Sequence, residues 1–148
     1  MEVLPHFWIS YYKENIFFLK KKNITNIIHL SKYEQFIKKN TIEEIRVPID
    51  YNEEMSLEEQ NNIMYQNLYD LTDYIHEKIT SNKNILLLGY SNKQDIDVLI
   101  IAYFIRFGSL TIHDSINFLK TKKENIFIPK CNFYFALNKF YNELLNKQ

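Results

Sequence analysis

The sequence predicts a single α/β domain, because short apolar runs typical of strands alternate with longer patterns typical of helices. A length of 148 residues with 46% hydrophobic and 16% aromatic residues is enough for one continuous core. No linker rich in Pro, Gly or Ser, low-complexity tract or internal repeat interrupts these segments. We therefore expect one domain over residues 1–148.

The first third of the chain predicts two strands with helical segments beside them. Ile27 and Ile28 are β-branched and suit a pleated surface, and Pro48 is expected to end the second strand. The predicted elements are an extended segment over Val3–Ser10, a helix over Glu14–Lys22 that buries Ile16, Phe17 and Leu19, a strand over Ile24–Leu30, a short helical segment near Tyr33–Lys38, and a strand over Glu43–Ile49.

The clearest local signal is a long amphipathic helix that ends near Thr80. Ser56 and Glu59 form a capping box, and apolar residues then recur at helical spacing. These apolar positions are Met64, Leu68, Leu71, Ile75 and Ile79.

A short strand, a loop and a buried helix follow one another in the next segment. Asn84–Leu88 is an apolar run typical of a central strand that is covered on both faces. After a loop over Gly89–Gln94, the helix from Asp95 to Phe107 is apolar nearly all round. A loop between a strand and a helix start is a common anion-binding arrangement.

The last part of the chain predicts two more helices. Gly108 ends the buried helix, and Thr111 with Asp114 resembles another capping box. Asn132 is predicted to cap the last helix. The apolar faces comprise Ile112, Ile116 and Leu119 in the first of these helices, and Phe133, Leu137, Phe140 and Leu144 in the second.

Charge and residue usage exclude several function classes. Eighteen basic residues balance eighteen acidic ones, which argues against nucleic acid or a membrane surface as partner, and the longest apolar stretch, Val98–Ile105, is too short to cross a bilayer. The histidines lack metal-ligand spacing, so no metal or cofactor is expected.

The single Cys131 and the lack of a signal-peptide pattern predict an intracellular, cytoplasmic protein, with the nucleus or a virion as alternatives. The bias toward Asn, Ile, Lys and Tyr suggests an AT-rich genome, such as that of a virus or protozoan.

Several strings, taken in order, resemble the small cysteine-dependent dual-specificity protein phosphatases over roughly Val3–Leu145. They are Leu4–Ile9, Phe18–Lys20, Asn23–Ser31, Arg46–Asp50, Ile101–Ile105, Ser115–Lys120 and Ile128–Phe135. The resemblance implies a central, mostly parallel sheet of four or five strands flanked by helices. It also implies a phosphate-binding loop between the central strand and the buried helix.

In active members of that family this loop reads His-Cys-x-x-Gly-x-x-Arg, in which the cysteine thiolate attacks phosphorus and the arginine grips phosphate oxygens. Alignment on Ala102 and Tyr103 places Gly89 at the nucleophile and Asp95 at the arginine. The degenerate loop comprises Gly89, Tyr90, Ser91, Asn92, Lys93, Gln94 and Asp95. The general-acid position falls at Tyr51, with Asp50 one residue earlier.

These replacements predict weak phosphate binding. Loss of a charge-assisted arginine contact costs about 1.5–3 kcal/mol, and repulsion by aspartate at about 4 Å adds roughly 1–4 kcal/mol. Phosphate affinity would fall by roughly two to five decades, of which Lys93 would restore a part. We expect the Asp95 carboxylate to fold onto the free amides at the helix start and to fill the vacated anion site.

Other residues that could suggest chemistry are better explained as structural. Cys131 is expected to pack as a small hydrophobe. Tyr90 and Ser91 have no activating base in the sequence, and the consecutive residues 113–115 would face different directions on a helix. The basic run at 20–22 is expected to be a solvated helix end.

The function predicted from these observations is that of a catalytically inactive pseudophosphatase, which acts as a protein-binding, scaffold or regulatory module. The expected partners are proteins, including substrates of active phosphatases, and a second copy of the chain. Two alternatives stay open. One is residual or different phosphoryl chemistry that uses Asp50, Asp95 or Asp97, and the other is a purely structural, self-associating component such as a virion protein.

Overall fold

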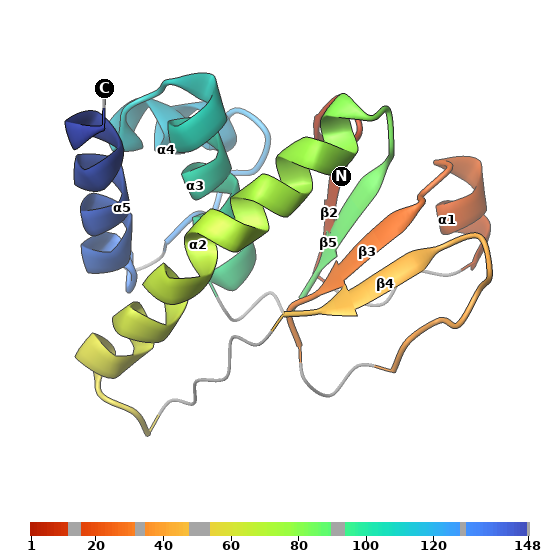
Figure 1. The fold of residues 1–148 in the computed structure, drawn as a ribbon, viewed down its shortest axis with the longest axis horizontal. Helices are drawn as coiled ribbons and strands as arrows, with labels where there is room; N and C mark the ends of the chain where they lie inside the picture. Colours follow the sequence, from red (N-terminus) through yellow and green to blue (C-terminus); the bar gives the residue numbers. More distant parts are fainter. Residues whose placement is uncertain (12–15, 32–34, 48–53, 90–93, 128–129, 148) are drawn as a thin grey trace. The chain divides into compact units, whose positions relative to one another are not determined.

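The computed structural model describes most of the chain and divides it into two compact units (Figure 1). The described residues are 1–11, 16–31, 35–47, 54–89, 94–127 and 130–147. Unit 1 comprises Met1–Pro48 and Ile75–Ile96, and unit 2 comprises Ile49–Tyr74 and Asp97–Gln148. The prediction of one domain over the whole chain stays a prediction.

Unit 1 contains a five-stranded sheet of order β1-β2-β5-β3-β4. Its strands are β1 (Glu2–Leu4), β2 (Phe7–Ser10), β3 (Asn26–His29), β4 (Glu43–Arg46) and β5 (Ile85–Leu88). Only the β1–β2 pair is antiparallel, so the carboxyl ends of β2, β5, β3 and β4 share one edge of the sheet. The expected mostly parallel sheet is confirmed.

The core of unit 1 forms where the middle strands meet helix α1 (Ile16–Lys21). All four residues of β3 and of β5 are buried, as the apolar composition of β5 predicts for a strand covered on both faces, whereas β3 buries two polar residues, Asn26 and His29. A buried cluster joins α1 to the two strands and contains Leu19, Ile24, Ile27, Leu86 and Leu88, with Trp8, Phe18, Ile37 and Ile42 packed against it.

The prediction for α1 was wrong at Phe17, whose side chain is 84% exposed. Leu19 is buried as expected, and Phe18 packs edge-on against Trp8 with ring centroids 6.0 Å apart. Phe17 and Leu19 are two positions apart and therefore lie on opposite sides of a helix, and the side that carries Leu19 faces the core. Phe18 takes the core-facing position that the sequence pattern assigned to its neighbour.

The extended segment Val3–Ser10 is a tight pair of strands instead of one. His6 adopts a positive φ of 73° between β1 and β2, which reverses the chain. The Ile9 amide donates to the Met1 carbonyl at 2.9 Å, and His6 Nδ1 lies 2.7 Å from Asn84 Oδ1. This polar contact fixes the turn against the segment that leads into β5.

The predicted helical segment near Tyr33–Lys38 is wrong for its described part, because residues 35–39 are irregular. Lys38 has a positive φ of 60°, which an α-helix does not allow. The amides of Ile37 and Lys38 donate to the Glu44 carboxylate, each at 2.9 Å, instead of to helix carbonyls. Contacts with β4 therefore outweigh local helix propensity here.

The long helix α2 (Leu57–Thr80) confirms the strongest local prediction and contributes residues to both units. Ser56 Oγ accepts a hydrogen bond from the Glu59 amide at 3.1 Å, as the capping box requires. Of the predicted apolar positions, Met64, Leu68, Leu71 and Ile75 are buried, and Ile79 is half-buried.

Unit 2 contains most of α3 (Asp95–Gly108), α4 (Ile112–Lys120) and α5 (Tyr134–Asn146). The run from Val98 to Ile105 is buried on every side, which confirms the fully apolar helix. Thr111 caps α4 by accepting the Asp114 amide at 3.0 Å. None of the helices that the structure describes is long and apolar enough to cross a bilayer.

The predicted cap of α5 at Asn132 was wrong, because its side chain does not cap the helix. The cap comes from α2 instead. The buried Asn61 accepts the Ala136 amide with Oδ1 and donates to the Asn132 carbonyl with Nδ2, both at 2.9 Å. A side chain from another helix thus satisfies a free amide in the first turn of α5.

Candidate functional site

The site predicted from the sequence lies where β5 leaves the sheet. Leu88 ends this middle strand, Gly89 follows it, and α3 begins at Asp95. The predicted order of a central strand followed by a buried helix is therefore confirmed. Tyr90, Ser91, Asn92 and Lys93 lie outside the described residues, as do Asp50 and Tyr51.

Gly89 is held at the carboxyl edge of the sheet by its neighbours. Its amide donates to the Ser10 carbonyl at 3.1 Å, and the residue is buried. Its φ is not positive, so the backbone does not require glycine. A Cβ atom at this position would lie 3.3 Å from two carbons of the Ile96 side chain and 3.4 Å from Leu30 Cβ. A small side chain therefore fits after a shift of a few tenths of an ångström by Ile96.

The first turn of α3 places two acidic residues in buried positions. Asp95 is 6% exposed and Asp97 is 4% exposed. In unit 2, Asp97 is paired with Lys123, whose Nζ lies 3.1 and 3.2 Å from the two carboxylate oxygens. The position aligned with the phosphate-gripping arginine therefore carries a buried carboxyl group. The hypothesis that the Asp95 carboxylate folds onto the free amides at the helix start stays a prediction.

Cys131, the only cysteine in the sequence, lies in an environment that disfavours a nucleophile. The pKa of its thiol is raised to about 11, because burial and the charge of Asp97 raise it and a hydrogen bond with the Phe133 backbone only partly opposes them. A thiol with this pKa is almost fully protonated at neutral pH, and the thiolate is the reactive form. The structural role predicted for Cys131 agrees with this environment.

The consecutive residues 113–115 also do not form a catalytic set. His113 is exposed and lies 3.0 Å from Asn117 Nδ2, and the Asp114 amide is used in the cap of α4. The Ser115 hydroxyl is fully buried and has no hydrogen-bond partner among the described residues. The helix thus separates their side chains, as predicted.

A buried polar cluster at the same edge of the sheet was not found from the sequence. It consists of His29, Phe36, Glu44 and Arg46, which we call the β3–β4 cluster. His29 Nε2 lies 2.8 Å from Glu44 Oε1, and the two side chains are 1% and 4% exposed. The His29 ring stacks on Phe36 at 4.8 Å, and Arg46 lies 5.0 Å above the Phe36 ring while donating to the Ser31 carbonyl.

Glu44 is the centre of this cluster and is ionised at neutral pH. Burial alone would raise the pKa of its carboxyl group, but hydrogen bonds from the Ile37 and Lys38 amides, and the hydrogen bond and charge of His29, together lower the pKa below its usual value. The carboxylate therefore ties the irregular 35–39 segment to β4. His29 and Arg46 are cross-strand partners in the parallel pair of β3 and β4. The cluster could not be predicted from the sequence, because this register is known only from the structure.

The described residues contain no group of three or more side chains suited to hold a metal ion. At the carboxyl edge they provide buried carboxyl groups, a buried imidazole and one glycine. The Glu44 carboxylate holds the Ile37 and Lys38 amides in place.

Comparison with known proteins finds similar structures but no similar sequence. No protein-family model matches the chain, and no curated protein matches it significantly. Among solved structures, human DUSP28 matches with a TM-score of 0.81 at 15% identity and covers 99% of both chains. A mouse putative dual specificity phosphatase complexed with zinc tungstate matches with a TM-score of 0.80 at 16% identity, over 99% of this chain and 88% of that one.

A third similar structure is the human tyrosine phosphatase-like serine/threonine/tyrosine-interacting protein. Its TM-score is 0.75 at 15% identity, over 97% of this chain and 96% of that one. These similarities show that the chain has the α/β fold of dual-specificity phosphatases, with a five-stranded, mostly parallel sheet flanked by helices.

Proposed function

We propose that this chain is a catalytically inactive protein with a phosphatase fold and that it acts by binding another protein. The observation that carries the proposal is Gly89. It follows the middle strand at the place where the resemblance puts the nucleophilic cysteine, and it has no side chain to attack phosphorus. The only cysteine is Cys131, whose thiol stays protonated at neutral pH.

Asp95 supports the same proposal through phosphate binding. The aligned arginine would supply two parallel charge-assisted hydrogen bonds to phosphate oxygens. A buried carboxyl group at that position, when ionised, repels a phosphate dianion instead. The two changes act independently on the same reaction, since one removes the nucleophile and the other weakens substrate binding.

A binding role is also consistent with the similar human protein whose name describes it as phosphatase-like and interacting. The chain keeps the complete fold while the residues for the reaction are replaced. A partner protein is the simplest ligand for such a scaffold. Substrates of active phosphatases are the partners that we favour.

The test of inactivity compares four proteins in the hydrolysis of an aryl phosphate. We expect no turnover by the wild type or by Asp95→Ala, because both lack a cysteine at position 89. We also expect none by Gly89→Cys, because the introduced cysteine would still face the Asp95 carboxyl group. Gly89→Cys combined with Asp95→Arg should regain measurable activity, because an aryl leaving group needs little help from a general acid. Wild-type turnover that Asp95→Ala abolishes would overturn the proposal and favour a different phosphoryl chemistry.

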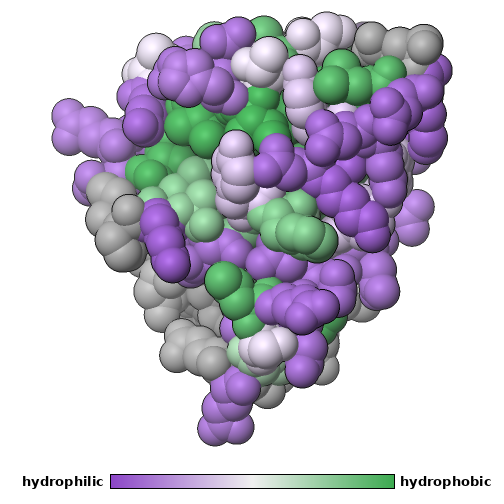
Figure 2. Space-filling model, turned by 90° about the vertical axis from the view of Figure 1, so that its left-hand side faces the viewer, coloured by the Kyte–Doolittle hydropathy of each residue, from purple (hydrophilic) through white to green (hydrophobic). Residues whose placement is uncertain are grey.

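Self-association is a second candidate, which exposed aromatic residues in unit 2 favour. Phe118, Tyr134 and Phe135 are 38%, 52% and 60% exposed, and aromatic side chains are frequent anchors in interfaces. Figure 2, which looks toward α5, shows hydrophobic side chains gathered at the surface among hydrophilic ones. Light scattering at two concentrations tests this candidate, since a mass that rises with concentration indicates a homodimer or larger assembly.

A further inference from the structure

Unit 1 has a second surface feature, at the amino ends of β3 and β4 and therefore at the edge of the sheet opposite Gly89. Two depressions of about 320 and 300 Å³ lie there. They share Thr25, Thr41 and Ile42 in their linings, so they are adjacent and border one region of the surface. We call it the lysine groove.

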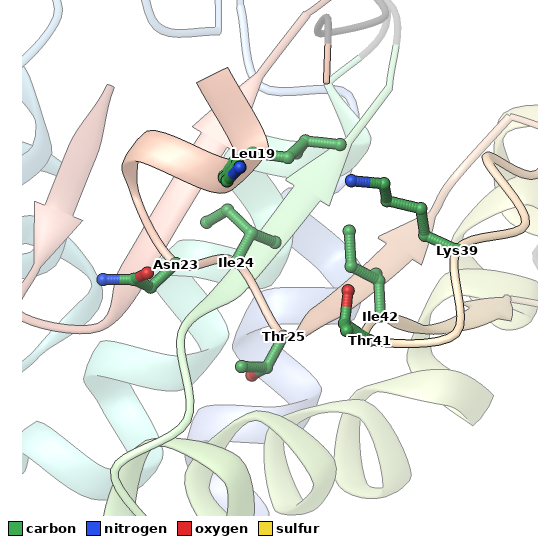
Figure 3. Close-up of a pocket in the computed structure, with 8 residues that line it drawn as sticks. Leu19, Asn23, Ile24, Thr25, Lys39, Thr41 and Ile42 are labelled. Carbon is green, nitrogen blue, oxygen red and sulfur yellow. The ribbon is translucent and has the colours of Figure 1, made fainter. Parts of the chain in front are cut away.

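The floor of the first depression, the one of about 320 Å³, is apolar. Leu19 and Ile24 are 1% and 4% exposed and belong to the core cluster of unit 1, and Ile42 packs against that cluster. Figure 3 shows the three side chains approaching one another from α1, from the turn after it and from the start of β4. A rigid apolar floor of this size accepts one or two hydrophobic side chains of a ligand.

The rim of the groove is basic. Lys20 and Lys39 line the first depression, and Lys78 and Lys83 line the second. Lys20, Lys39 and Lys83 form no ion pair with any residue in the described part of the chain. Figure 3 shows Lys39 extending from its segment toward α1, the helix to which Lys20 belongs.

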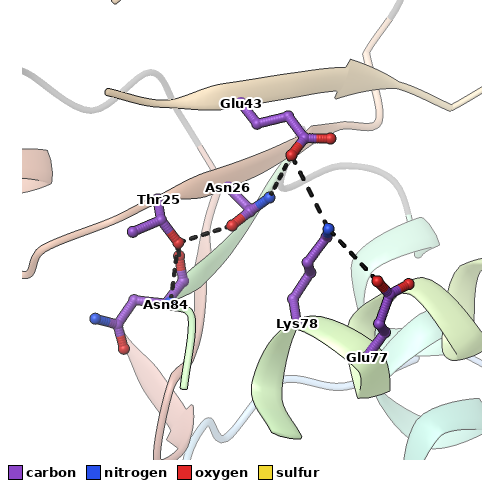
Figure 4. Close-up of polar contacts among 6 residues, drawn as sticks. All are labelled: Thr25, Asn26, Glu43, Glu77, Lys78 and Asn84. Carbon is purple, nitrogen blue, oxygen red and sulfur yellow. Dashed lines mark hydrogen bonds and ion pairs between the residues drawn. The ribbon is translucent and has the colours of Figure 1, made fainter. Parts of the chain in front are cut away.

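The acidic residue in the groove is already engaged. Glu43 accepts a hydrogen bond from Asn26 Nδ2 at 3.3 Å and lies 4.0 Å from Lys78 Nζ, which in turn lies 3.8 Å from Glu77 (Figure 4). The remaining lysines are therefore a local excess of positive charge on a chain whose total charge is zero. Such an excess favours an anionic ligand at this place alone.

We propose that the lysine groove docks an acidic peptide segment of a partner protein that carries one or two hydrophobic anchor residues. The apolar floor accounts for the anchors, the uncompensated lysines account for the acidic residues, and the exposed Thr41, which lines both depressions, offers a hydroxyl group to the peptide backbone. The proposal rests on the binding role proposed above and assigns it a surface away from the degenerate loop.

The probe for this proposal is a fluorescein-labelled peptide, Asp-Glu-Glu-Leu-Phe-Glu-Asp-Glu, whose binding is followed by fluorescence anisotropy. Lys20→Glu with Lys39→Glu should weaken binding by about tenfold or more, because each reversal replaces attraction with repulsion. Lys120→Glu with Lys122→Glu is the matched control, since it changes the total charge equally at exposed positions of unit 2. We expect the control pair to change affinity by less than about threefold.

Two further measurements keep the result interpretable if a charge-reversed variant folds poorly. Replacing Leu-Phe by Ser-Ser in the peptide should also weaken its binding, and amide NMR shifts on titration of the wild type should concentrate at Thr25, Thr41 and Ile42. Absence of peptide binding, equal losses in both lysine pairs, or equally tight binding of oligothymidylate would overturn the proposal.

The outcome also separates this proposal from the proposed function. If the wild type is inactive and both lysine pairs bind the peptide equally, the groove assignment fails while an inactive binding protein stands. If the wild type hydrolyses phosphate and peptide binding still depends on Lys20 and Lys39, inactivity fails while the docking groove stands.

Discussion

Replacing Glu44 with glutamine tests the β3–β4 cluster. One Glu44 oxygen accepts hydrogen bonds from His29 Nε2 at 2.8 Å and from the Ile37 amide at 2.9 Å, and the other accepts the Lys38 amide at 2.9 Å. Glutamine keeps one oxygen for the first pair but turns an NH₂ group toward the Lys38 amide. It also replaces charge-assisted bonds by neutral ones, which are about half as strong.

The expected loss in the free energy of unfolding is about 2–4 kcal/mol. One hydrogen bond to a charged group is worth about 1.5–3 kcal/mol, and the other two bonds to Glu44 weaken. The loss is limited because the exposed Lys38 amide can form a hydrogen bond with water instead. The matched control is Glu43→Gln at the neighbouring, 58% exposed side chain, which should cost less than about 1 kcal/mol. Urea unfolding measures both variants. Equal effects at the two positions, or a Glu44→Gln cost below about 0.5 kcal/mol, would refute the assigned role of this carboxylate.

The same comparison has a defined pH dependence. Because folding lowers the pKa of Glu44, its stabilising contribution is complete above the unfolded pKa and is lost as the pH falls through the lower, folded pKa. The difference in stability between wild type and Glu44→Gln should therefore be constant near neutral pH and should shrink below about pH 4. A difference that grows on acidification would contradict this assignment.

Three further predictions follow from other parts of the chain. Asn61→Ala should lower the free energy of unfolding by about 2–4 kcal/mol, because it leaves the buried Ala136 amide without its acceptor; Asn67→Ala, which removes one bond to a carbonyl of its own helix, should cost less than about 1 kcal/mol in the same urea titration. Cys131 should react with iodoacetamide at pH 7.5 roughly a hundredfold more slowly than a free cysteine, and the rate should rise with pH up to about 11, which mass spectrometry follows. Phe17→Ser should change the melting temperature little, since an exposed side chain contributes within about 0.5 kcal/mol; a large loss would mean that Phe17 packs in the core.

Local signals in the sequence predicted the elements that local physics decides. The capping boxes at Ser56 and Thr111 and the apolar run of α3 depend on neighbours within a few residues, and the structure has all three. The same holds for the place of Gly89 and Asp95, because strand and helix around the loop were both strongly patterned. This much of the candidate site could be predicted.

The failures occurred where a distant partner decides the outcome. The helix expected near Lys38 does not form in its described part, where the backbone amides donate to Glu44 instead. The cap expected from Asn132 is provided by Asn61 of another helix. The pairing of His29 with Glu44 was not predicted, because it depends on the register of β3 and β4. Contacts across strands and helices have no signature in one segment, so sequence patterns do not reveal them.

The dependence of α5 on Asn61 also bears on the order of folding. The capping side chain precedes Ala136 by 75 residues, so the bond can form only after a long loop has closed. A helix of 13 residues is marginal by itself in water, and this one has no side-chain cap of its own. The last helix is thus expected to gain its structure late, when α2 is already formed, and a peptide cut to its boundaries should be largely unstructured.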